Sequence, residues 1–187
     1  MAGGKLKEHS ATYQDVLSAP AHMVAEIING ALHAHPRPAP RHSHAYSVLG
    51  AKIGGPFHFD NDGPGGWWIL DEPELHLGPD VLVPDIAGWR RERMPNLPDT
   101  AYFETVPDWV CEILSNSTRE YDLTAKRDIY AREAVTHLWL VDPDAHTLEA
   151  FDLTNGKWLL IANLHGDEQV SVPPFDAISF SLGALWP

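Results

Sequence analysis

The chain has 187 residues, of which 44% are hydrophobic and 21% charged, a composition typical of a folded domain with one core. The formal net charge of -13 argues against a protein that coats nucleic acid electrostatically, because phosphate contacts need clustered lysine and arginine. The single cysteine, Cys111, excludes an intramolecular disulfide and a metal site made of paired cysteines.

No stretch of the sequence approaches the roughly eighteen apolar residues of a membrane helix. The N-terminal residues lack the apolar middle of a secretory signal, so we expect a cytoplasmic protein with no membrane partner. Most basic residues after position 60 fall between 90 and 132, which predicts a local basic rim on an acidic body.

The first third of the chain predicts a short helix, a hairpin and a longer helix. Residues 1–10 are expected to be a disordered lead-in to a single domain over 11–187, whose first helix, capped by Ser10 or Thr12, ends at Leu17. Residues 22–35 carry Asn-Gly between two apolar runs, which is a strong hairpin signal. Apolar residues at helical spacing predict a helix over 41–53.

The remainder predicts mostly strands. A strand, a helix and a strand in succession indicate a parallel crossover pair, and a second Asn-Gly hairpin follows near the C-terminus. A capping box of Ser117 and Glu120 marks the start of the helix. The predicted strands are 67–70, 74–77, 81–89, 108–114, 136–141, 148–153, 158–162 and an edge strand at 169–172, with the helix over 118–134.

Two of these apolar strands each carry an acid, Asp85 and Glu112, and an acid among core residues is costly to bury unless it is paired or binds a metal. If the strands pair, both carboxylates meet at one end of the sheet, where they would suit Mg²⁺. On the following helix, Asp122, Lys126 and Tyr130 are spaced to form one stripe. A lysine there can orient a water bound to the metal.

Arg119 lies near the start of the same helix, where the partial positive charge of the helix end favours an anion. We therefore count Arg119 and Tyr130 as supporting residues close to a phosphate, and Asp122 as a further supporting residue on the same stripe. The pattern extends from the first acid-bearing strand to the strand over 136–141, after which Asp142 follows.

The segments PDIAGW, CEIL, STREYD-x3-K-x3-Y and HLWLVDP resemble the PD-(D/E)XK nuclease superfamily. Within it, the chain is most similar to a bacterial family of restriction endonucleases and domains of unknown function that is expanded in cyanobacteria and actinobacteria. The resemblance implies a restriction-endonuclease-like α/β fold, with a central mixed sheet flanked by helices and with N- and C-terminal hairpins.

The resemblance also implies site residues and a cofactor. Asp85 and Glu112 match the two acids of the motif, and Glu26 resembles the extra N-terminal acid that some members add to the metal site. The cofactor would be Mg²⁺, for which Mn²⁺ can substitute. The motif lysine expected two residues after Glu112 is replaced by Leu114, so Lys126 would take its place from the helix.

Simpler interpretations compete with each of these roles. Asp85 and Glu112 could be structural carboxylates held by arginine or backbone groups, Lys126 a solvated partner of Asp122, and Glu26 a hairpin acid beside a basic residue. The histidines near positions 33–44 could form a metal cluster, but we expect them at the surface, because residues two apart on a helix face different directions.

The first functional hypothesis is a Mg²⁺-dependent endonuclease that hydrolyses phosphodiester bonds in DNA, although the residues do not distinguish DNA from RNA. Its catalytic residues would be Asp85, Glu112 and Lys126. The alternative is a catalytically silent protein on a nuclease scaffold that acts as a binding or regulatory module. Cutting both strands would need two sites, which favours a homodimer, and the acidic charge favours a separate DNA-binding partner.

Overall fold

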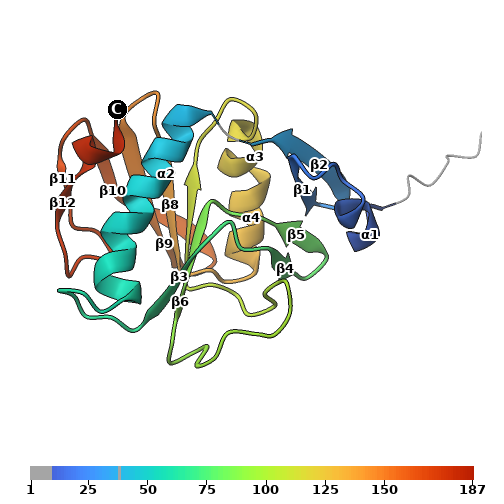
Figure 1. The fold of residues 1–187 in the computed structure, drawn as a ribbon, viewed down its shortest axis with the longest axis horizontal. Helices are drawn as coiled ribbons and strands as arrows, with labels where there is room; N and C mark the ends of the chain where they lie inside the picture. The colour runs from blue at the N-terminus through green and yellow to red at the C-terminus, as the bar shows by residue number, and fades with distance from the viewer. Residues whose placement is uncertain (1–9, 38) are drawn as a thin grey trace, which may run out of the picture.

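The computed structural model describes residues 10–37 and 39–187, and a six-stranded mixed sheet lies at its centre (Figure 1). The pair β7–β8 is parallel and the other neighbours are antiparallel, which confirms the predicted crossover. The lead-in predicted at 1–10 falls, except for Ser10, outside the described residues. The strand order is β10 (Lys157–His165), β9 (Thr147–Thr154), β8 (His137–Asp142), β7 (Trp109–Ile113), β6 (Ile86–Arg90) and β3 (Trp67–Asp71).

A four-stranded sheet contains the predicted N-terminal hairpin. Asn29 and Gly30 form its turn with φ values of 52° and 79°, the left-handed conformation that this pair adopts readily. The order is β2 (Ala31–Pro36), β1 (Met23–Ile28), β5 (Asp80–Leu82) and β4 (Leu75–Leu77). The predicted edge strand at 169–172 is shorter and pairs elsewhere, because β11 (Gln169–Val170) forms a separate small sheet with β12 (Phe180–Ser181).

Helices cover both faces of the central sheet (Figure 1). The first helix begins after Thr12, whose backbone N–H and hydroxyl both donate to the Asp15 carboxylate at 2.8 Å. Within the described residues, no helix is long and apolar enough to cross a membrane. The helices are α1 (Tyr13–Leu17), α2 (Pro40–Ile53), a π-helical turn η1 (Gly54–His58), α3 (Arg119–Leu123), α4 (Ala125–Arg132) and a final 3-10 turn η2 (Leu182–Leu185).

The two faces of the central sheet bury separate apolar clusters. One cluster joins α2 to the C-terminal segment around Phe175, with Trp109 and Trp139 from the sheet between them. The other joins α4 to the four-stranded sheet and includes Trp89 and Tyr130. Strand β7 contributes to both clusters because successive side chains of a strand point to opposite faces.

The single strand predicted over 81–89 is wrong. The chain leaves the four-stranded sheet after Leu82 and enters the central sheet at Ile86, so Val83, Pro84 and Asp85 form a connection between sheets. The physical reason is Pro84, which has no N–H to donate to a sheet ladder. The break releases Asp85 from strand pairing and leaves its side chain at the end of the sheet.

The helix predicted over 118–134 is also interrupted. Thr124, with φ of -126° and ψ of -91°, separates α3 from α4, and its hydroxyl donates to the backbone carbonyl of Glu120. The predicted capping box is wrong, because Thr118 occupies the N-cap position and its side chain makes no capping bond. The Ser117 hydroxyl lies 3.0 Å from that of Ser115 instead.

Candidate active site

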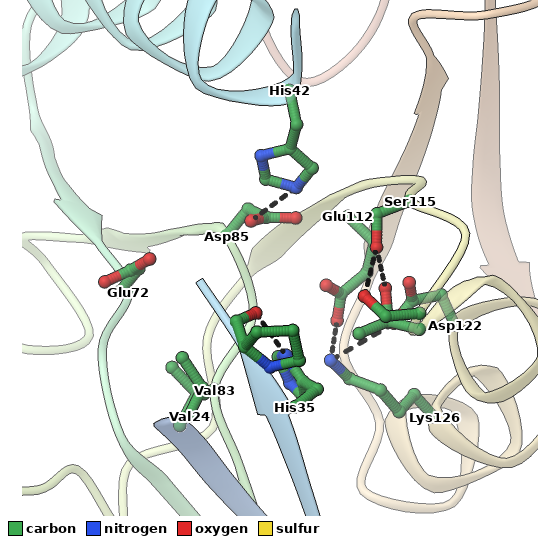
Figure 2. A pocket seen from close by; sticks show the side chains of 13 residues that line it. Val24, His35, His42, Glu72, Val83, Asp85, Glu112, Ser115, Asp122 and Lys126 are labelled. Atoms are coloured by element: carbon green, nitrogen blue, oxygen red, sulfur yellow. Dashed lines mark hydrogen bonds and ion pairs between the residues drawn. The ribbon is translucent and has the colours of Figure 1, made fainter. Parts of the chain in front are cut away.

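The structure brings Asp85 and Glu112 to one cavity at the end of the central sheet (Figure 2). Glu112 lies near the C-terminal end of β7, and the backbone N–H of the next residue, Ile113, donates to Asp85 Oδ2 at 2.7 Å. The cavity between the central sheet, α2 and α3–α4 has a volume of about 30 Å³, enough for a water molecule. The two acids that the sequence singled out are therefore neighbours.

Lys126 lies at the centre of the acids. Its Nζ is 2.9 Å from Glu112 Oε1, 3.1 Å from Glu26 Oε1 and 3.3 Å from Asp122 Oδ1. The alternative of a solvated lysine is wrong, because the side chain is only 3% exposed. A single ammonium is therefore paired with three carboxylates.

Glu26 approaches this lysine from the N-terminal hairpin. Burial alone would raise its pKa, but the Lys126 ammonium, the His35 side chain 3.3 Å away and the Val83 N–H lower the pKa to about 2. Glu26 does not line the cavity. In this arrangement its carboxylate is ionised and contacts the lysine directly.

At Glu112 the effects that raise the pKa outweigh those that lower it, whereas at Glu26 the reverse holds. Burial, together with the nearby charges of Asp122, Asp85 and Glu26, holds the pKa of Glu112 well above its usual range despite the adjacent ammonium. The buried Tyr130 hydroxyl donates to Glu112 Oε1 at 2.6 Å. Burial, reinforced by the Glu112 charge, also raises the pKa of Tyr130 well above its usual range. Glu112 therefore binds its proton more tightly than an exposed glutamate does.

His42, expected at the surface, is instead buried beside Asp85. Its Nε2 lies 3.1 Å from Asp85 Oδ1, so both oxygens of that carboxylate have partners (Figure 2). Burial lowers the pKa of His42, but the Asp85 carboxylate outweighs this and raises it overall. The expectation is confirmed for exposed His44, and it is wrong for His42 because this residue shares the buried face of α2 with Ala45 and Leu49. In the sequence, the signal that His42 is buried was its spacing of three residues from Ala45 and seven from Leu49.

Arg119 and Asp122 have different surroundings, although both lie on the short helix α3. Asp122 is buried, and burial raises its pKa despite the neighbouring Lys126. Arg119 is 44% exposed, pairs with Asp142 and does not line the cavity. The structure therefore brings Asp122 into the cluster and leaves Arg119 at its edge.

Asp85 and Glu112 fit a hard divalent cation. Mg²⁺ binds through one or two protein carboxylates and keeps several waters. The buried Asp122 Oδ1 beside these two acids makes no hydrogen bond in the described residues, which leaves an oxygen free for a water of the cation. Within those residues, no three or more His, Cys, Asp or Glu side chains are arranged to hold a metal, so Glu26 does not complete a three-carboxylate site.

The mixed sheet, its flanking helices and the acids at its end define a restriction-endonuclease-like fold. The chain belongs to the family Uma2, described as "putative restriction endonuclease", whose model matches residues 11–183. The family resemblance inferred from the sequence motifs is thereby confirmed.

A solved structure supports the same fold. The chain is similar to a protein from Anabaena variabilis described as a "putative nuclease belonging to DUF820", with a TM-score of 0.75 and 23% sequence identity. The match covers 94% of this chain and 97% of that one, and at this identity it establishes the fold alone. No curated protein matches the chain.

Proposed function

We propose that this protein is a metal-dependent endonuclease that hydrolyses phosphodiester bonds in DNA in the cytoplasm. The observation that carries the proposal is the cavity in which Asp85, Glu112 and Lys126 meet, within a chain of the Uma2 family. Buried ionisable groups with strongly shifted pKa values gather at functional sites more often than elsewhere.

In this proposal Asp85 and Glu112 hold Mg²⁺, or Mn²⁺ in its place. A bound divalent cation supplies Lewis-acid polarisation of a phosphate and lowers the pKa of a bound water. His42 and the Ile113 N–H hold the Asp85 carboxylate in one orientation, and Tyr130 does the same for Glu112. In the reaction a water oxygen bonds to phosphorus while one ester P–O bond breaks, and one proton of that water ends on the alcohol oxygen that leaves.

Lys126 would orient the attacking water as a donor. The surrounding carboxylates raise its pKa well above the usual range even though burial lowers it, so the side chain keeps its proton and does not act as the base. Of the three carboxylates around Lys126, that of Asp122 is the most distant, at 3.3 Å, and its Oδ1 accepts no hydrogen bond, so this is the contact that a water would replace. Glu26 then keeps the ammonium in place, and Arg119 is a supporting residue at the edge.

The test compares cleavage of supercoiled plasmid and single-stranded DNA at low salt, with Mg²⁺ or Mn²⁺, by wild type and Glu112→Ala. Cleavage by the wild type and its loss in the variant would support the proposal. Glu120→Ala is the matched control, because this exposed acid on α3 lies outside the cavity. Metal binding that persists equally in Asp85→Ala and Glu112→Ala would contradict the assigned ligands.

A second candidate is a catalytically silent binding or regulatory module. It is favoured by the protein contacts already made in the site, since Lys126 pairs with three carboxylates and both Asp85 oxygens have protein partners. Absence of cleavage and of divalent-metal binding in the wild type would select this candidate. Sedimentation analysis alongside the cleavage assay tests the proposed homodimer, which would supply a site for each DNA strand.

A further inference from the structure

We infer that the groove beside the acid cavity binds a nucleotide flanking the scissile phosphodiester, with Arg37 and Arg41 contacting its phosphate. This inference rests on the proposed function. The groove has a volume of about 630 Å³ and lies between the start of α2 and the loop after β7. His42, Ser115 and Ser117 line both the groove and the acid cavity, so a strand lying in one extends directly into the other.

The charge of the groove differs from that of the whole chain. Two arginines line it against one aspartate, Asp144, whereas the chain carries a net charge of -13. Arg37 and Arg41 are 63% and 65% exposed, and their ion pairs with Glu72 and Asp144 are long, at 3.4 and 3.9 Å. Exposed pairs of this kind contribute little and exchange readily for a stronger anionic partner.

The other arginines of the described chain are engaged in the fold. They form close ion pairs or lie over aromatic rings, whereas Arg37 and Arg41 make only long ion pairs. The engaged contacts are Arg93 with Asp108, Arg119 with Asp142, Arg132 with Asp80, Arg90 over Trp67, Arg91 over Trp68 and Arg127 over Phe151.

The floor and walls of the groove suit the remaining parts of a nucleotide. Leu114 and Pro143 provide apolar surface for a sugar or base, while Ser115, Asn116 and Ser117 offer hydroxyl and amide groups. The first turn of α2 adds partial positive charge, because its N-cap residue Ala39 makes no side-chain capping bond. A ligand that combines an apolar body with an anion matches this set.

The test measures binding of short fluorescent DNA, single-stranded and duplex, to the full chain in EDTA, which prevents metal-dependent cleavage. Arg37→Ala and Arg41→Ala are each expected to weaken binding. For each phosphate that a variant no longer neutralises, the slope of log affinity against log salt should fall by about 0.7 for single strands and about 0.9 for duplex. Lys52→Ala is the matched control, since it removes one exposed positive charge from the opposite end of α2.

Equal weakening in Lys52→Ala and the arginine variants would overturn the inference, as would absence of DNA binding by the wild type. Cleavage assays with Mg²⁺ separate it from the proposed function. If the wild type cleaves and the arginine variants keep the same KM and DNA affinity, the groove assignment fails alone. If DNA binding depends on both arginines but no cleavage occurs, the nuclease proposal fails, and the groove is a nucleotide-binding site without a scissile phosphodiester beside it.

Discussion

The two faces of strand β7 bury different kinds of side chain. On one face, Cys111 and Ile113 join an apolar cluster with Trp139 and Phe175. On the other face, Glu112 is equally buried but contacts Lys126 and Tyr130. Adjacent residues of one strand therefore lie in an apolar core and in a charged cluster.

The apolar face gains free energy from every side chain that it removes from water. The charged cluster on the other face has the opposite sign, because each buried charge loses its hydration and is tolerated only through its partners. A packed apolar cluster would stabilise the fold at least as much as the charged cluster does. The charged cluster consists of Glu26, Glu112, Asp122 and Lys126. Because stability alone does not explain this charged cluster, we propose that the acids serve the function of the protein.

The largest effect is expected from removing the central charge of the acid cluster. Lys126→Met would leave three buried carboxylates without their cation and is expected to destabilise the fold by about 3–5 kcal/mol. Urea unfolding followed by tryptophan fluorescence measures the change. Lys157→Met, at an exposed position on β10, is the control and should change stability little. A destabilisation below about 1 kcal/mol for Lys126→Met would contradict the cluster's dependence on this lysine.

Phe175→Ala makes the corresponding change on the apolar face. Its ring centroid lies 4.7–5.7 Å from those of Phe57, Trp67, Trp109 and Trp139, so truncation leaves a cavity and should cost about 3–4 kcal/mol. Phe175→Ala that is folded should bind the metal as wild type does. Lys126→Met that is folded should bind the metal with an affinity that differs from that of wild type. Phe59→Ala, at a side chain 68% exposed, is the control for removal of a phenyl group. Altered metal affinity in Phe175→Ala would argue that the two faces are coupled.

The sequence predicted the central strands and the meeting of the two acids well. Apolar runs identified β7 and β8, and the motif acids Asp85 and Glu112 were expected to meet, as they do. The single strand over 81–89 was wrong, because the predicted alternation gave too little weight to Pro84. Sequence periodicity describes one element at a time, and the exchange between two sheets at this proline depends on tertiary packing.

The partners of the acids could not be predicted in the same way. His42 and Glu26 reach the cluster from α2 and β1, far from Glu112 in sequence, and no local spacing links such residues. The helix stripe did predict that Asp122 and Lys126 would approach each other, even though the helix breaks at Thr124 between them. The roles proposed for these side chains in catalysis stay predictions.

The pH dependence of stability should reveal the charge imbalance at Glu112. A carboxyl whose pKa is higher in the folded than in the unfolded chain binds more protons when folded, so stability falls as the pH rises above the unfolded value, near 4.5. Glu26 has the opposite sign: its contribution is present above 4.5 and disappears as the pH falls towards about 2.

Glu112→Gln removes the ionisable group and keeps an oxygen for Tyr130 and Lys126 to contact. Relative to wild type, the variant should gain stability as the pH rises above 4.5, by up to about 1.4 kcal/mol for each pH unit. Urea unfolding across acidic and neutral pH measures the difference. Glu120→Gln, at an exposed acid, is the matched control. A pH-independent difference between Glu112→Gln and wild type would show that ionisation of Glu112 carries no cost.

The smallest effect concerns Ala134, which follows the end of α4, the helix that carries Lys126. Ala134 has a φ of 63°, a left-handed conformation that costs a residue with a Cβ about 1–2 kcal/mol relative to glycine. The Val135 N–H donates to the Tyr130 carbonyl at 2.9 Å, which fixes this conformation as the helix ends.

Ala134→Gly is therefore expected to stabilise the protein by about 1 kcal/mol, because glycine adopts this φ without a steric cost. Ala131→Gly introduces the same chemical change within α4, where glycine should destabilise by about 1 kcal/mol. Opposite shifts in the urea midpoint, with metal binding unchanged in both variants, would separate the stability of the helix from the chemistry of its lysine. Shifts of the same sign would contradict the assigned strain at Ala134.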